Sequence, residues 1–159
     1  MNHKLFIGSI IVILLLLVAI IFTLRQAGTE KIREADRFSM PVIERVMNQL
    51  SSWNYKNLKP YLHKKFIRSL SEKEFQQELD GLSVLGKVVE FKNVRHVSHV
   101  SYKHWLYGKC AVNKYSVPTQ FEKGKGVIIF NVNHCFEEAK ISFFQVHSKA
   151  LPVKSPAFE

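Results

Sequence analysis

The chain has 159 residues, room for about one domain of ordinary size, and a net charge of +10 from 23 Lys and Arg against 13 Asp and Glu. Its twelve Phe, five Tyr and two Trp supply apolar mass that argues against a disordered chain. Residues 5–24 form one uncharged, strongly apolar run. Together these features argue against a large multidomain enzyme or a freely soluble cytosolic protein, and they indicate one membrane-attached domain.

The apolar run has the length of a transmembrane helix, because about twenty helical residues cross the ~30 Å hydrocarbon core of a bilayer. A cleaved signal peptide is the competing interpretation, but its apolar region is usually about 7–15 residues long. Gln26 and Gly28 also make a poor cleavage pair. We therefore predict an uncleaved anchor over residues 5–24, preceded by a short head, residues 1–4.

The flanks of the anchor give opposing signals about its orientation. Basic residues are more numerous after the run than before it, which by the positive-inside rule favours a cytoplasmic domain. A very short head before a signal-like run is instead typical of a signal anchor, and long domains translocate largely regardless of their charge. We expect a cytoplasmic N-terminus and a periplasmic domain at a bacterial inner membrane.

Gly28 is predicted to end the membrane helix, within a linker of residues 25–31. After this linker, the apolar residues have the spacing of a helix. Pro41 lies inside this segment, so either the helix kinks there or Ser39 caps a new helix with Pro41 in its first turn. Apolar residues recur here every three or four positions: Ile32, Ala35, Phe38, Val42, Ile43, Val46, Met47, Leu50 and Trp53.

Two more helices are predicted before Gly86. Asn57 can cap a short helix with Pro60 in its first turn. The next helix begins with a capping box, in which Ser71 is followed three positions later by Glu74, and Gly86 is placed to end it. The inner face of this last helix is expected to consist of Phe75, Leu79, Leu82 and Leu85.

After Gly86 the pattern becomes that of strands. Four are predicted, with a loose tail over residues 149–159 behind them. Helices followed by strands with short turns predict an α+β domain over residues 32–148, in which about three helices cover one face of a curved four-stranded antiparallel sheet. The predicted strands are residues 88–100, 106–121, 127–132 and 139–148, with turns at 122–126 and 133–138.

Several of these features together resemble the nuclear transport factor 2-like (cystatin-like cone) superfamily. They are Trp53-Asn54, the segment Leu58…Pro60-Tyr61-Leu62, the Ser71-capped helix ending in Leu85-Gly86-Lys87, and the strands that follow. More narrowly, Phe121-Glu-Lys-Gly before an apolar strand is similar to bacterial membrane-anchored members of unassigned function. The resemblance implies a cone-like fold over roughly residues 32–148 and brings no catalytic signature.

Two cysteines, Cys110 and Cys135, are expected on or beside adjacent strands. If residue 122 lies opposite residue 126, Cys110 falls opposite residue 138, and a bulge or a wider turn is needed to bring Cys135 to it. An oxidising compartment would permit a disulfide. Two free buried thiols and a redox or nucleophilic role are the alternatives, although the chain has no Cys-x-x-Cys motif for the latter.

Histidines cluster near the predicted strands as His96, His99 and His104, and His134 neighbours Cys135. On a regular strand, residues three apart point to opposite faces, so His96 and His99 cannot both face one metal ion. We interpret these histidines as solvated or satisfied in the core, and we expect no metal site and no cofactor.

The isomerases of the resembled superfamily place an Asp base and a Tyr or acid donor inside the cone. In this sequence Glu90 is the one acid in a strand interior, and Tyr102, Tyr107 and Tyr115 are the tyrosines that could line a pocket with it. Tyrosine on a strand more often packs, and no base-and-donor pair is evident. An isomerase-like or hydratase-like enzyme is therefore the least favoured hypothesis.

Positive charge gathers in two parts of the sequence. Nucleic acid is the usual partner of such a surface, but an extracytoplasmic location removes it from reach. Anionic lipid heads are nearer, and a solvated basic face is the simplest interpretation. The residues of this basic surface are Lys56, Lys59, Lys64, Lys65 and Arg68, and then Lys87, Lys92 and Arg95.

We therefore predict a non-catalytic, single-pass membrane protein. Its partners would be the lipid bilayer and either an envelope protein or a small apolar ligand, and a homodimer is compatible with this prediction. The alternative is a subunit of an envelope-spanning assembly, resembling the inner-membrane scaffold of type IV secretion systems. That scaffold has the same order of anchor and cone domain.

Overall fold

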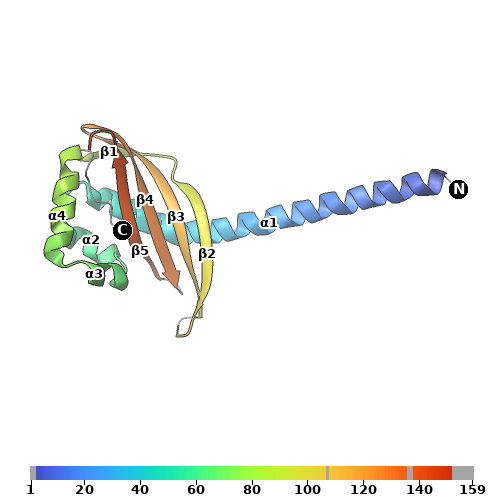
Figure 1. Cartoon of the computed structure of the whole chain (residues 1–159), viewed down its shortest axis with the longest axis horizontal. Helices are drawn as coiled ribbons and strands as arrows, with labels where there is room; N and C mark the ends of the chain where they lie inside the picture. The colour runs from blue at the N-terminus through green and yellow to red at the C-terminus, as the bar shows by residue number, and fades with distance from the viewer. Residues whose placement is uncertain (1–2, 107, 136–137, 152–159) are drawn as a thin grey trace. The chain divides into compact units, whose positions relative to one another are not determined.

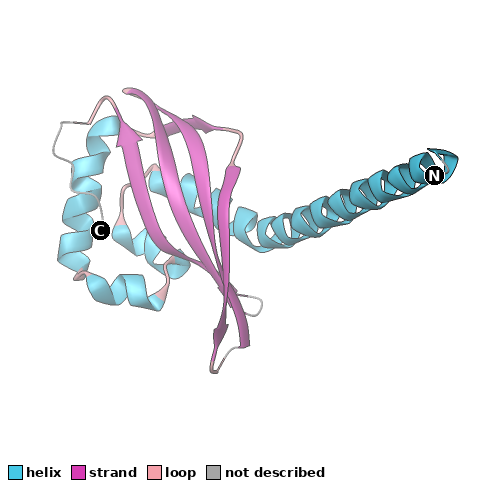
Figure 2. Ribbon diagram, turned by 45° about the vertical axis from the view of Figure 1, so that its right-hand side comes forward, coloured by secondary structure: helices cyan, strands magenta, loops and turns pink. Residues whose placement is uncertain are grey.

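The computed structural model describes residues 3–106, 108–135 and 138–151 (Figures 1 and 2). The chain divides into two compact units, residues 1–35 and residues 36–159. Most of the predicted loose tail, residues 152–159, lies outside the described part. Within that part, Leu151 packs against the core.

Helix α1 (His3–Leu50) is long and apolar enough in its N-terminal half to cross a membrane. It continues through residues 25–31, so the prediction that Gly28 ends the membrane helix is wrong. A glycine in a helix interior costs about 1 kcal/mol relative to alanine, which weakens a helix without ending it. Pro41 also lies inside α1, and Ser39 does not begin a new helix.

The helix predicted after Asn57 is instead three short pieces: α2 (Tyr55–Leu58), the 3₁₀ helix η1 (Lys59–Tyr61) and α3 (Lys64–Ser69). Asn54, not Asn57, caps the first, because its side chain accepts a hydrogen bond from the backbone N–H of Lys56 at 2.9 Å. Pro60 has no N–H to continue an α-helix, and Leu62 has an extended backbone that separates η1 from α3.

The third predicted helix is confirmed as α4 (Glu72–Leu82), followed by the 3₁₀ helix η2 (Ser83–Leu85). Both bonds of the capping box are present. Ser71 Oγ accepts from the Glu74 N–H at 3.2 Å, and Glu74 Oε2 accepts from the Ser71 N–H at 2.8 Å. Gly86 follows with a φ of 77°, a conformation that disfavours any residue with a Cβ.

The sheet is antiparallel and the fold is α+β, as predicted, but it has five strands rather than four. The predicted strand 88–100 is broken near Asn93, whose φ is 54°. Its two parts pair with opposite ends of one long neighbour, so the strand order is β1-β3-β4-β5, with β2 also on β3. The strands are β1 (Val88–Phe91), β2 (Arg95–His104), β3 (Gly108–Phe121), β4 (Gly124–Cys135) and β5 (Glu138–Ser148).

One face of this sheet carries the core of the folded unit. Figures 1 and 2 show α2, α3 and α4 on the same side of the sheet. The C-terminal end of α1 belongs to the same core cluster. Large side chains with essentially no exposed surface fill the space between the layers: Ile43, Met47, Leu50, Phe75, Leu79, Phe121, Phe130 and Phe144.

Trp53 links the helices to the start of the sheet. Its indole Nε1–H donates to the Gly86 carbonyl at 2.8 Å, and its own carbonyl accepts from Gln76 Nε2 at 2.9 Å. The ring is 6% exposed and stacks on Phe121, with centroids 6.2 Å apart. Trp53 is therefore a core residue with all its polar contacts inside the protein.

Candidate binding surface

The structure describes three of the four residues of the predicted pocket, Glu90, Tyr102 and Tyr115, and it does not bring these three together. Glu90 is exposed on β1 and forms an ion pair with Lys92 at 2.6 Å. Tyr102 lies directly opposite Cys110 and shares its face of the sheet. Cys110 and Tyr115 are five positions apart on β3, so Tyr102 and Tyr115 lie on opposite faces. Tyr107 lies outside the described residues.

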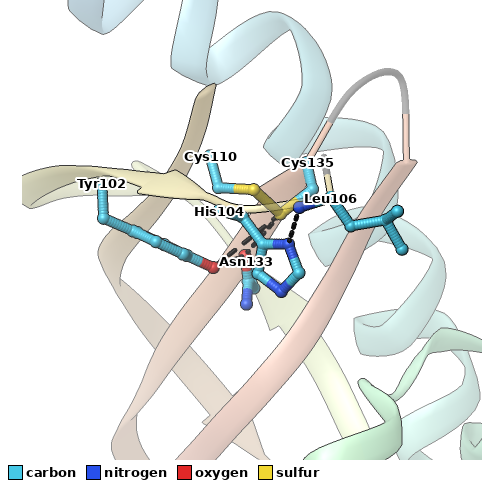
Figure 3. The surroundings of a disulfide bond; sticks show 6 residues. All are labelled: Tyr102, His104, Leu106, Cys110, Asn133 and Cys135. Carbon is cyan, nitrogen blue, oxygen red and sulfur yellow. Dashed lines mark hydrogen bonds between the residues drawn. A yellow bond between two sulfur atoms is a disulfide. The ribbon is translucent and has the colours of Figure 1, made fainter. Parts of the chain in front are cut away.

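Cys110 and Cys135 are joined by a disulfide (Figure 3). They lie directly opposite one another on β3 and β4, with Cα atoms 4.4 Å apart. The predicted register was wrong by three residues, because the turn is Glu122–Lys123, with Phe121 opposite Gly124. The shorter turn brings the two cysteines together without a bulge.

Polar contacts surround the disulfide close to the turn of the β2–β3 hairpin. The Tyr102 hydroxyl donates to Asn133 Oδ1 at 3.1 Å and lies 3.8 Å from Cys135 Sγ, as Figure 3 shows. Nearer the tip, the backbone N–H of Leu106 donates to His104 Nδ1 at 3.2 Å. The disulfide and these contacts join all three strands β2, β3 and β4 near the turn of the hairpin.

Exposed apolar side chains gather on this hairpin. Among the described residues of the folded unit, five of the seven large apolar side chains that are exposed belong to β2 or to its turn. Trp105 is 88% exposed, Val100 61% and Leu106 57%. The other two of the five are Val97 and Tyr102. We define these five residues as the hairpin patch.

The hairpin patch lies in the most one-sidedly charged part of the chain. No Asp or Glu occurs between Glu90 and Glu122, whereas this stretch holds several basic residues. On the hairpin itself these are Arg95, Lys103, Lys109 and Lys114, all exposed. The patch is therefore apolar, with basic residues around it.

Strand β2 is also an edge strand within the described part of the chain, because β3 is the one strand with which it pairs there. A register shift between His96 and Ser98 interrupts its ladder. Edge strands present unpaired backbone groups, and proteins use them to bind extended segments of other chains. Two properties thus coincide on β2, an open edge and exposed apolar side chains.

The same register shift corrects the prediction about the histidines. It places His96 opposite Tyr115 and His99 opposite Asn113, and those partners share a face, so the two histidines share it too. His99 Nδ1 lies 2.7 Å from Asn113 Oδ1, and the His96 ring meets the Tyr115 ring edge-on at 5.3 Å. Among the described residues, no three His, Cys, Asp or Glu side chains lie close enough to hold a metal ion.

Beside these histidines, a buried tyrosine meets a carboxylate of α1. The Tyr115 hydroxyl donates to Asp36 Oδ1 at 2.9 Å. Burial is the main cause that raises the pKa of the Tyr115 phenol, and the negative charge of Asp36 adds to it, while the nearby Ser39 hydroxyl acts in the opposite sense. Sequence reasoning missed Asp36 because it lies among the mixed charges after the anchor. Its position seven residues before the buried Ile43, on the same side of the helix, was the available signal.

His134 and Lys59 of the predicted basic surface both contact other side chains of the folded unit. The ring of His134 stacks on Phe38 of α1, with centroids 4.1 Å apart. Lys59 forms an ion pair with Glu72, which raises the pKa of Lys59 and lowers that of Glu72. The other members of the predicted basic surface are also exposed, on α2, on α3, around β1 and at the start of β2: Lys56, Lys64, Lys65, Arg68, Lys87, Lys92 and Arg95.

Comparison with known proteins gives no family for this chain. No protein-family model, no curated protein and no solved structure matches it. Any function proposed for the chain therefore depends on the geometry of the hairpin and on the apolar helix.

Proposed function

We propose that this is a single-pass membrane protein whose α+β unit is a non-catalytic binding domain, with the β2–β3 hairpin as its contact surface. The observation that carries the proposal is the hairpin patch, which holds most of the exposed large apolar side chains of the described folded unit. Clustered apolar exposure with a polar rim is typical of interaction sites rather than of an idle surface.

The anchor supports this proposal. Helix α1 is long and apolar enough to span a membrane and continues into the folded unit as one helix. We further propose that the N-terminus is cytoplasmic, that the folded unit lies in the bacterial periplasm, and that the unit is a cone-like member of the nuclear transport factor 2-like superfamily. The order of helices before an antiparallel sheet supports the last of these.

The packing of the interior favours a binding domain over an enzyme or a carrier of small apolar ligands. Phe75, Phe130 and Phe144 fill the space in which such a ligand would sit. Among the described residues, Asp36 and Tyr115 bring a carboxylate and a tyrosine hydroxyl together at the inner face of the sheet, and these two groups are bonded to each other. A partner on the outside of the hairpin needs neither a cavity nor a free acid.

Site-specific photo-crosslinking in membranes tests the contact surface. A photoreactive phenylalanine at Val100 should form adducts, whereas the same residue at Val89 should not. The two positions are matched, because both are β-strand valines and Val89 is 64% exposed. Equal crosslinking at the two positions would remove the reason for choosing the hairpin.

Two further measurements test the anchor and its orientation. The chain should stay with membranes through an alkaline wash, and N-terminal sequencing of the extracted protein should not begin after Leu24. An alkaline phosphatase fused after Ser148 should be active. An inactive phosphatase together with a fluorescent cytoplasmic reporter at the same site would reverse the orientation.

A further inference from the structure

We propose that the tip of the β2–β3 hairpin, Trp105 and Leu106 between Lys103 and Lys109, binds the headgroup layer of an anionic bilayer. The inference rests on the proposed function, since it names the partner of the same hairpin. It concerns the end of the hairpin, which Figures 1 and 2 both show reaching beyond β4 and β5.

The two apolar side chains of the tip are presented to solvent rather than folded back. Trp105 is the most exposed large apolar side chain among the described residues, at 88%, and Leu106 follows it in the turn at 57%. The indole ring stacks on His104 with centroids 6.2 Å apart, which leaves its apolar surface outward. Tryptophan, with an apolar ring and one N–H donor, is enriched where hydrocarbon meets water in membranes.

The charges of the tip form a pair that folding alone does not explain. Lys103 and Lys109 are direct cross-strand partners, and His104 is the next residue along the strand. Like charges directly opposite one another destabilise a strand pair. An anionic surface at the tip would offset this repulsion, because each basic residue close to such a surface is attracted to it.

The strands that carry the tip are joined to their neighbours before any contact with a partner. The Cys110–Cys135 disulfide follows directly after Lys109, and the Tyr102–Asn133 hydrogen bond joins β2 to β4. Figure 3 shows these groups close to Leu106 and His104. A pre-organised tip loses little conformational freedom on binding.

The tether favours a bilayer over a protein as the first partner. Residues 25–35, between the apolar run and the folded unit, could span at most about 40 Å even if fully extended. A domain held this close to a surface meets it at high effective concentration, so a small contact suffices.

Tryptophan fluorescence of the full-length chain in vesicles tests the inference. The two tryptophans report on different environments, because Trp53 is 6% exposed and Trp105 is 88% exposed. Subtracting the spectrum of Trp105→Phe from that of the unmodified chain isolates the tip. In vesicles of phosphatidylcholine and phosphatidylglycerol, the isolated Trp105 emission should shift to the blue and be quenched by lipids brominated near the headgroup.

A charge variant and a matched control complete the design. Lys103→Gln with Lys109→Gln should reduce the quenching to the level seen in phosphatidylcholine alone. Val89→Ser removes an apolar side chain that is 64% exposed on β1, away from the hairpin, and should leave quenching unchanged. Melting temperatures no lower than that of the unmodified chain show that the comparison is made between folded proteins.

The outcomes separate this inference from the proposed function. If the chain stays in the vesicles through an alkaline wash but Trp105 emission is the same as in detergent, the tip does not bind lipid and the inference is wrong. Adducts at Val100 with a protein would then name a protein as the hairpin's partner. If the alkaline wash releases the chain, both the proposed anchor and the inference fail.

Discussion

Strands β2 and β3 are partners in one hairpin, yet they use their side chains in opposite ways. They pair at nine positions. Every second residue in the C-terminal half of β3 is buried, including Tyr115, Val117 and Phe121. No residue of β2 is buried, and Val97 and Val100 are more than half exposed.

The difference comes from what lies around each strand. Strand β3 has neighbours on both edges, and its inner face meets the helices, so burial stabilises it. Strand β2 has β3 on one edge, and its apolar side chains have no described element over them. Burial therefore accounts for the role of β3 in stability, and the exposed apolar residues of β2 are the basis for our proposal that β2 binds a partner.

The largest expected effect is in the buried part of this comparison. Phe121→Ala at the end of β3 should lower the free energy of unfolding by about 3–5 kcal/mol, because it leaves a cavity next to Trp53. Urea unfolding of the detergent-solubilised chain, followed by Trp53 fluorescence, measures it. A loss below about 1 kcal/mol would mean that β3 is not the stabilising strand.

The disulfide comes next in size, and it joins β3 to β4 close to the turn of the β2–β3 hairpin. Its cysteines are 25 positions apart, a loop length for which the chain-entropy model gives about 3–4 kcal/mol. Cys110→Ala with Cys135→Ala should therefore lower the free energy of unfolding by about that amount. Thiol counting on the denatured, unreduced protein provides the direct check, and two free thiols per chain would contradict the bridge.

Much of the fold was predictable because local signals agreed with the tertiary structure. The Ser71–Glu74 capping box and the place of Gly86 at the end of the helical segment were predicted from residue type and spacing alone. The change from helical to strand periodicity at Gly86 likewise gave the α+β class. In each case a short stretch of chain carries the determining chemistry.

The errors arose where a neighbour in space decides the outcome. Nothing local distinguishes a two-residue turn at Glu122–Lys123 from a wider one, although the choice moves the register by three positions. The break at Asn93 and the shift beside His96 are likewise set by the long partner strand β3. The Asp36–Tyr115 bond joins residues 79 positions apart, a separation over which sequence spacing has no predictive value.

Tyr115→Phe sharpens the comparison at the inner face of β3. Losing the hydrogen bond to Asp36 should cost about 1–2 kcal/mol near neutral pH. Because the pKa of Tyr115 is raised in the folded protein, the unfolded chain loses this proton first. Stability should therefore fall as the pH rises above about 10, the ordinary tyrosine pKa. Unfolding measured from pH 8 to 11 should show a smaller alkaline loss for Tyr115→Phe, and identical pH profiles would contradict this.

A smaller effect is expected at the start of α4, far in sequence from the hairpin. Ser71→Ala removes the side-chain acceptor for the Glu74 N–H and should cost about 1 kcal/mol. Separately, hydrogen bonds from the Ser71 side chain and from the Ser71 backbone N–H lower the pKa of the Glu74 carboxyl in the folded protein, so their contribution should shrink as the pH falls towards and below the ordinary pKa of a glutamate. The bond from the Glu74 N–H does not titrate, so thermal melts at pH 7 and pH 3 should show a smaller difference between Ser71→Ala and the unmodified chain at the lower pH, without full convergence.

The smallest effect on stability is the one that isolates binding. Val100→Ser should change the free energy of unfolding by no more than about 0.5 kcal/mol, because the side chain is 61% exposed and folding buries little of its apolar surface. Val117→Ser on β3, where the valine is fully buried, is the matched variant and should cost several times more. If β2 is the binding strand, Val100→Ser should reduce crosslinking from a photoreactive residue at Tyr102 while the melting curve stays in place. A large stability loss for Val100→Ser would instead show that β2 is part of the core, and the division between the two strands would no longer hold.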